Sequence, residues 1–150
     1  MRYRNYWMVA VLMIGALSLV IFTRAFADET ETGYSEPALV EPIEGTALNR
    51  VTLTQKAAER LGVETAAVED EEVGGALAKV LPYSAVLYDA NGDTWTYTNP
   101  EPLVFIRHQI SIDRVDGESA ILSEGPDAGT KVVTVGAAEL IGTEFGVDED

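Results

Sequence analysis

The chain has 150 residues with no cysteine, and its 25 acidic and 10 basic residues give a formal net charge of −15. This length is enough for one domain. The lack of cysteine excludes disulfides, zinc-thiolate sites, a thiolate nucleophile and a lipid-modified cysteine. Because like charges repel, the acidity makes nucleic acid and anionic lipid headgroups poor candidate partners.

Residues 1–27 are predicted to be a signal anchor or a signal peptide. Arg2 and Arg4 precede a long apolar run over residues 6–22, and an Ala-Phe-Ala sequence ends at Ala27. As a helix the run reaches roughly 25 Å, slightly short of the roughly 30 Å hydrocarbon core of a bilayer. It is longer than the usual apolar core of a signal peptide. We therefore expect a membrane anchor with the folded part outside the cytoplasm, periplasmic or extracellular; the alternative is secretion after cleavage behind Ala27.

The rest of the chain is strongly acidic. The leader contains three basic residues and no acidic one, which leaves seven basic and 25 acidic residues and a formal charge of −18. Such acidity is typical of a soluble surface, and steering toward a basic partner surface is the alternative reading. Residues 28–45 combine five glutamates and two prolines with few apolar residues, so they are predicted to form a disordered tether. Residues 148–150 are predicted to be an acidic, solvated tail.

Residues 46–68 predict a strand, a short helix and a second strand. The first strand is expected over residues 46–52 and the second over residues 63–68. Between them Thr54 is a plausible N-cap for a helix over residues 55–61, and Gly62 suits the position just past its end. A spacing of four along this helix predicts a buried stripe of Leu53, Ala57 and Leu61.

The second half of the chain, residues 80–147, predicts short strands separated by turns. Asn91-Gly92 supplies the positive φ angles that a tight hairpin needs. The expected strands cover residues 84–88, 94–98, 104–112, 119–123 and 131–135. The fold class predicted for residues 46–147 is therefore mainly β, a small β-barrel or β-roll with one short helix, preceded by the N-terminal apolar helix.

Alternation along these strands predicts which side chains are buried. Trp95 and Tyr97 share one face, and such aromatics are usually core residues or cross-strand pairs rather than a ligand surface. Along the strand over residues 104–112 one face is predicted inward and the other outward. The inward set is Val104, Ile106, Ile110 and Ile112, and the outward set is Phe105, Arg107, Gln109 and Ser111. His108, the only histidine, falls on the inward set and is expected to be a half-buried core residue rather than a ligand.

No catalytic, cofactor-binding or metal-binding residue is predicted. The Asp89-Ala-Asn-Gly-Asp93 sequence has Thr94 and Pro100 where a calcium loop needs glycine and glutamate, so a hairpin turn is favoured. The three methionines all lie in the leader, which gives no support to copper or silver binding. The acidic residues 69–72 are read as a solvated linker. Ser84 and Ser111 lack a general base in any recognisable motif.

Several sequences in the second half carry a resemblance. They are Leu81-Pro-Tyr-Ser-Ala-Val-Leu, Asn91-Gly-Asp-Thr-Trp-Thr-Tyr and a run from Leu122 to Leu140 with the pattern LxxGxxxGxxVVxxGAxxL. Together they resemble the membrane-proximal β-domain of the periplasmic adaptor, or membrane fusion, proteins of tripartite efflux pumps. Residues 51–68 resemble the adaptor segment that precedes the lipoyl-like domain and the long helical hairpin. Between Val68 and Val80 those two parts have no counterpart.

The resemblance implies a non-enzymatic, truncated adaptor-like protein associated with a membrane transporter. Its implied partners are an inner-membrane transporter or a full-length adaptor, with membrane attachment through residues 1–27 and no nucleic acid. Without the helical hairpin the chain is not expected to reach an outer-membrane channel. The alternative is a stand-alone extracytoplasmic β module that binds a ligand or an envelope protein, and a hydrolase is disfavoured.

Overall fold

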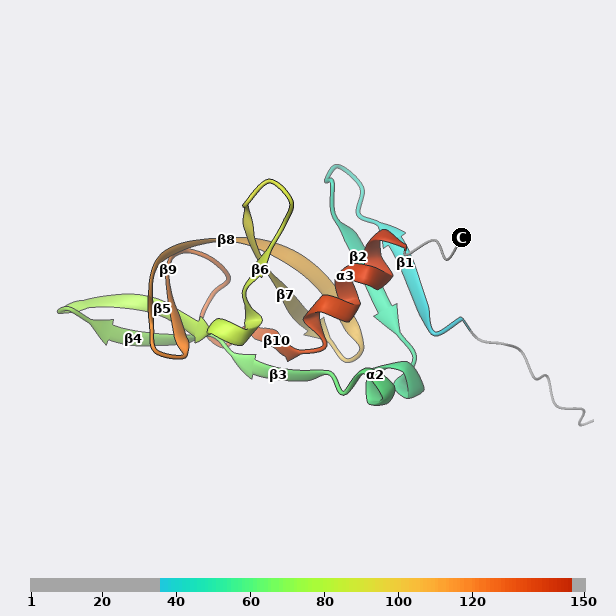
Figure 1. Ribbon diagram of the computed structural model, residues 1–150, viewed down its shortest axis with the longest axis horizontal. Coiled ribbons are helices and arrows are strands. Elements are labelled where there is room, and N and C mark those ends of the chain that lie inside the picture. Colours follow the sequence, from blue (N-terminus) through green and yellow to red (C-terminus); the bar gives the residue numbers. More distant parts are fainter. Residues whose placement is uncertain (1–35, 147–150) are drawn as a thin grey trace, which may run out of the picture. The chain divides into compact units, whose positions relative to one another are not determined.

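The computed structural model describes residues 36–146, so the predicted leader and the acidic tail lie outside the described residues. Within the described range the chain is mainly β, with 54% of the residues in strands that form a curled, half-barrel sheet (Figure 1). In this range we find no helix with the length and apolar character that crossing a bilayer requires.

Ten strands and two α-helices make up the described part of the chain. The strands are β1 (Ala38–Pro42), β2 (Asn49–Leu53), β3 (Glu64–Ala67), β4 (Glu69–Val73), β5 (Ala76–Pro82), β6 (Leu87–Tyr88), β7 (Thr94–Glu101), β8 (Val104–Asp116), β9 (Ser119–Glu124) and β10 (Lys131–Val135). The helices are α2 (Gln55–Leu61) and α3 (Ala137–Phe145), and a single 3-10 turn covers Tyr83–Ala85.

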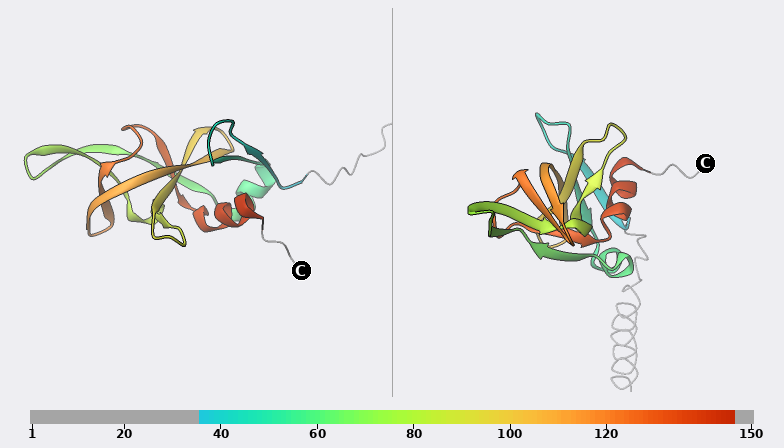
Figure 2. Two further views of the ribbon diagram at one scale, coloured as in Figure 1. Left: turned by 90° about the horizontal axis from the view of Figure 1, so that it is seen from above. Right: turned by 60° about the vertical axis from the view of Figure 1, so that its left-hand side comes forward.

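The sheet is organised around the long strand β8. The strand order is β3-β10-β7-β8-β9-β5-β4, with β2 also pairing to β8, β1 to β2 and β6 to β7. All of these pairs are antiparallel. β8 spans 13 residues and arches from the β1–β2 end to the β4–β5 end, so it belongs to both halves of the sheet (Figures 1 and 2).

Both faces of the sheet are buried, but at different places. Neighbouring residues of β10 show this directly, because Val133 packs in a core with Tyr97 while Val132 packs in a second core with Ile110. Side chains of adjacent strand residues point to opposite faces. The curled sheet therefore encloses one core on each face.

The two cores explain a wrong prediction for β8. Phe105 was expected to face outward, yet it is only 3% exposed and packs in the first core with Val51. Ile110 lies on the opposite face in the second core, as expected. Val104, on the face opposite to Phe105, is buried as well, so both faces of β8 are covered at its start.

His108 was also placed wrongly. Its side chain is exposed, although Ile110 on the same strand face is buried. His108 pairs across the ladder with Thr96 of β7. His108 therefore lies on the same face of β8 as Ile110, but beyond the part of that face that the second core covers.

The predicted helix is confirmed with its caps. Thr54 Oγ1 accepts a hydrogen bond from the Ala57 backbone N at 3.2 Å, and Gly62 ends α2 with φ of 63°. Leu53 and Ala57 are buried and Leu61 packs against the same core, as the spacing predicts. The structure adds a second helix, α3, in the closing segment for which we predicted no secondary structure.

Two segments predicted to lack structure are strands. Within the predicted tether, Ala38–Pro42 forms β1 and pairs with β2, so the folded part begins before residue 46. The predicted acidic linker is β4, which pairs with β5 through a turn at Gly74 and Gly75, both with positive φ. The carboxylates of β4 point into solvent from the end of the sheet, and charged side chains there protect a strand from unwanted pairing.

The glycine and apolar positions of the LxxGxxxGxxVVxxGAxxL run all have structural roles. The apolar positions are buried: Leu122, Val132, Val133, Ala137 and Leu140. A Cβ on Gly125 would meet Leu122 Cδ1 at 2.5 Å, and Gly129 has φ of 88°. Gly136, with φ of 87°, lies so close to Val63 that an added Cβ would be 3.1 Å from Val63 Cγ2. The pattern therefore specifies a turn, a strand buried on both faces and the start of α3.

Candidate functional site

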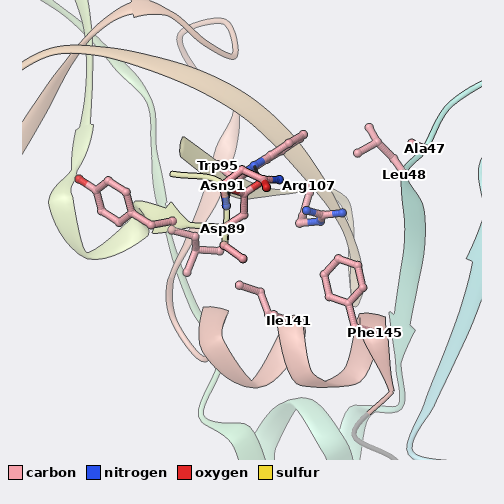
Figure 3. A pocket seen from close by; sticks show the side chains of 11 residues that line it. Ala47, Leu48, Asp89, Asn91, Trp95, Arg107, Ile141 and Phe145 are labelled. Atoms are coloured by element: carbon pink, nitrogen blue, oxygen red, sulfur yellow. Dashed lines mark hydrogen bonds between the residues drawn. The ribbon is translucent and has the colours of Figure 1, made fainter. Parts of the chain in front are cut away.

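A pocket of about 560 Å³ opens where the β1–β2 turn, the β6–β7 hairpin and α3 approach one another (Figure 3). Its walls are mainly apolar, and the largest side chains among them are Leu48, Leu87, Tyr88, Trp95, Arg107, Ile141 and Phe145. Pockets of this size and character are typical of small-molecule sites.

Arg107 of β8 lies at the centre of one wall. Its guanidinium carbon is 4.8 Å from the Trp95 ring centroid and 4.7 Å from that of Phe145, so the cation lies between two aromatic rings (Figure 3). Both distances are within the range of a cation–π contact. The Arg107 side chain is only 10% exposed. Two aromatic contacts and near-complete burial therefore fix its orientation.

Glu144 of α3 neutralises Arg107 from inside the protein. Its side chain is fully buried, and its Oε2 accepts a hydrogen bond from Arg107 Nε at 2.7 Å. The same oxygen accepts from the Tyr97 hydroxyl, and Oε1 accepts from Asn49 Nδ2 at 3.4 Å. These donors come from β8, β7 and β2, so one carboxylate ties α3 to three strands.

Tyr97 is a stable hydrogen-bond donor in this cluster. Burial raises the pKa of Tyr97 far above its usual range, and the hydrogen bond and charge of Glu144 act in the same direction. The phenol therefore stays protonated at any physiological pH and keeps donating to Glu144.

Asp89 lies at the pocket rim, in the β6–β7 turn. Its Oδ1 accepts from the backbone N of Asn91 at 2.8 Å and of Asp93 at 2.9 Å, and its Oδ2 accepts from Trp95 Nε1 at 3.2 Å. Partial desolvation acts to raise the pKa of Asp89, but these hydrogen bonds outweigh it and hold that pKa below its ordinary value. The sequence that superficially resembled a calcium loop thus uses its first aspartate to build the predicted hairpin turn and to orient Trp95.

The structure brings together residues that the sequence had left apart. Trp95 and Tyr97 do share one face, but Tyr97 is fully buried whereas Trp95 forms a pocket wall. The importance of Arg107 and Glu144 was missed. A signal did exist, because Glu144 lies four residues after Leu140 on the buried stripe of α3, and a carboxylate in that position requires a partner.

Besides Arg107, the polar side chains that line the pocket are those of Tyr88, Asp89 and Asn91. Within the described range the lining contains no serine, threonine, cysteine, histidine or lysine. Over residues 36–146 no three His, Cys, Asp or Glu side chains gather in a way that would hold a metal ion. The expectation that the chain has no catalytic, cofactor or metal residues stays a prediction.

In comparisons with known proteins, no protein-family model, no characterised protein and no solved structure matches this chain.

Proposed function

We propose that this chain is a non-enzymatic, adaptor-like protein whose β unit docks onto an inner-membrane transporter or a full-length adaptor. Residues 1–27 would hold it at the membrane, with the folded part outside the cytoplasm. The proposal rests on the resemblance of two separate segments, residues 51–68 and residues 81–140, to one adaptor domain.

The observation that carries this proposal is how those two segments combine. β3 from the first segment pairs with β10 of the second, and β2, which ends inside the first segment, pairs with β8. Two segments that together form one domain in the adaptors are expected to pair in this way, so the pairing supports the proposal. The finer fold that we propose is the small β-barrel or β-roll that the pattern of short strands and turns predicts.

The β4–β5 hairpin accounts for the shortness of the chain. In the adaptors the lipoyl-like domain and the helical hairpin would be inserted between these segments. Here β4 and β5 are joined by the two residues Gly74 and Gly75 and remain hydrogen-bonded to one another. A β unit closed by this hairpin could contact a transporter near the membrane without an inserted helical hairpin.

Co-purification tests the docking proposal. The full chain, tagged at its C-terminus, is expressed in its native cells, crosslinked in the membrane and purified at low and at moderate salt. Mass spectrometry is expected to identify a transporter subunit or a full-length adaptor in the captured material. Repeated capture of neither, at both salt concentrations, would contradict docking and favour the stand-alone binding module.

The binding-module alternative is favoured by one specific observation, the apolar pocket beside Arg107. A docking protein needs no such cavity, whereas a ligand-binding module does. A saturable small-molecule ligand with no captured membrane partner is the combination of results that would support it.

A further inference from the structure

We infer that the pocket beside Arg107 binds a neutral, mainly apolar small molecule that carries a hydrogen-bond acceptor such as a carbonyl oxygen. The inference rests on the pocket alone and holds whether or not the chain docks onto a transporter. Three features of the pocket carry it: its apolar walls, the free donors of Arg107 and the balance of charge around them.

The apolar walls of the pocket favour a ligand whose surface is mainly apolar. Leu48, Leu87 and Ile141 line the cavity together with the rings of Trp95 and Phe145, which come from four separate parts of the fold (Figure 3). A ligand that covers these side chains removes their apolar surface from water, and that removal is the main driving force for binding in such sites.

The guanidinium group supplies the polar contact. Within residues 36–146, Arg107 donates a hydrogen bond only from Nε, to Glu144. Its Nη1 and Nη2 groups have no hydrogen-bond partner among those residues. The side chain is nine-tenths buried and lines the pocket, so these remaining donors meet whatever occupies it. A donor covered by a ligand without a matching acceptor is left unsatisfied, which weakens binding.

The charged groups around the pocket favour a neutral ligand. Glu144 already compensates Arg107 at 2.7 Å, so the site offers little net attraction to an anion. Asp89 at the rim is held ionised by its hydrogen bonds and repels an anion further. A cation in contact with the Nη groups would in turn be repelled by Arg107 itself. A neutral acceptor satisfies the donors without either repulsion.

Four size-matched compounds test this selection: 4-phenylbutan-2-one, n-butylbenzene, 4-phenylbutanoate and 4-phenylbutylammonium. The full chain with Trp7→Phe, in lipid nanodiscs, leaves Trp95 as the single tryptophan. Its indole N–H resonance is followed by NMR against the free concentration of each compound in the dialysate. The site-specific signal separates binding in the pocket from partitioning into lipid.

The ketone is expected to shift the Trp95 resonance saturably and to bind at least about tenfold more tightly than the other three, in line with a hydrogen bond to a charged donor. Ala47→Phe, which fills an exposed position of the pocket wall, is expected to weaken the ketone at least about tenfold. Ala76→Phe, the same change at an exposed residue of β5 outside the pocket, is the matched control and should leave binding unchanged.

Arg107→Lys tests the role of the guanidinium while keeping a positive charge beside Glu144. The preference for the ketone over n-butylbenzene is expected to fall to about twofold or less, because the planar donor array is lost. Equal binding of all four compounds, tighter binding of the carboxylate or the ammonium compound, or insensitivity to Ala47→Phe would each overturn the inference. So would the absence of any saturable shift.

Discussion

At the scale of single residues, the stability of the fold depends on the buried contact between Arg107 and Glu144. A buried ion pair adds little over an apolar pair of the same shape, but removing one partner leaves the other charge uncompensated. Here Glu144 also accepts from Tyr97 and Asn49, whereas a glutamine in its place offers these three donors one oxygen, adds an amide donor and carries no charge.

Glu144→Gln is therefore expected to destabilise the protein by about 3 kcal/mol, within the range for breaking a buried charge pair. Urea denaturation in the Trp7→Phe background, followed by the fluorescence of Trp95, measures the change. Glu139→Gln makes the same substitution at an exposed position of α3 and is expected to cost less than about 0.5 kcal/mol. Equal effects of the two substitutions would show that the cluster does not stabilise α3.

A second residue-scale prediction concerns Lys79 and pH. Lys79 Nζ donates to Asp127 Oδ1 at 2.9 Å and to the Gly125 carbonyl at 3.0 Å, which ties β5 to the loop before β10. The hydrogen bond and charge of Lys79 hold the pKa of Asp127 below its ordinary value of 3.8. A lowered pKa in the folded state means that this stabilisation is present above about pH 3.8 and is lost as the pH falls through the folded-state value.

Lys79→Gln is expected to raise the pKa of Asp127 toward 3.8, as measured by NMR titration of its carboxyl carbon. Lys131→Gln, on the strand β10 that follows the Asp127 loop, removes the same charge without the hydrogen bond and should leave that pKa nearly unchanged. An identical titration in the wild type and in Lys79→Gln would contradict the role assigned to Lys79.

The structural role and the burial of individual residues could be predicted only partly from the sequence. The positions of Thr54 and Gly62 follow from local backbone chemistry, and the structure confirms them. Of Asn91-Gly92 only the glycine has the positive φ that was expected, at 90°, whereas Asn91 does not. Phe105 and His108 were misplaced because burial depends on which face of a curled sheet is covered at each point. That information is non-local, so alternation alone cannot provide it.

At the scale of elements, the structure confirms most of those that are bounded by turn and cap signals, but the strand predicted over residues 84–88 is reduced to β6 behind a 3-10 turn. α2, the β8–β9 hairpin and β10 all lie close to their predicted ranges. β4 was missed because it is an exposed strand of mainly acidic residues, and β1 because it is an exposed strand within a stretch rich in glutamate and proline. They are strands because β2 and β5 offer backbone partners, which composition does not reveal.

The cap of α2 gives an element-scale prediction. Thr54 Oγ1 accepts a hydrogen bond from the Ala57 backbone N at the start of the helix. It also donates to the Pro37 carbonyl at 3.3 Å, which holds the residue just before β1 against the helix N-terminus. Thr54→Ala is expected to cost about 1 kcal/mol, the usual effect of losing an N-cap. Thr54→Ser keeps the hydroxyl and should recover most of that stability in the same urea titration. A stable Thr54→Ala variant would mean that packing alone defines the start of α2.

At the scale of the whole molecule, charge is the dominant feature. A formal charge of −18 on residues 28–150 is expected to speed association with a basic partner surface and to slow it when salt screens the charges. Capture of the proposed membrane partner should therefore fall as sodium chloride rises from 50 to about 300 mM, where the screening length shortens below roughly 10 Å. Sucrose at equal osmolarity is the control and should have no such effect. Capture that does not change with salt would argue against electrostatic steering.

The pocket could not be predicted from the sequence. Its walls come from the β1–β2 turn, the β6–β7 hairpin, β8 and α3, and two of these four parts were not expected as structured elements. The aromatic pair on β7 was visible, but nothing local indicated that Arg107 would lie between Trp95 and Phe145. The proposed docking, in contrast, depends on sequence segments that were visible from the beginning.

Site-specific photocrosslinking in native membranes tests the docking proposal most directly. A photoreactive residue is placed at exposed positions of the adaptor-like segments, including Ala128 and Glu139, and at Glu71 of the hairpin that the adaptors lack. If the shared β unit makes the contact, adducts with a transporter subunit or a full-length adaptor should form from positions in the shared segments and not from Glu71. Adducts from Glu71 alone, or no membrane-partner adduct from any position, would contradict the proposal.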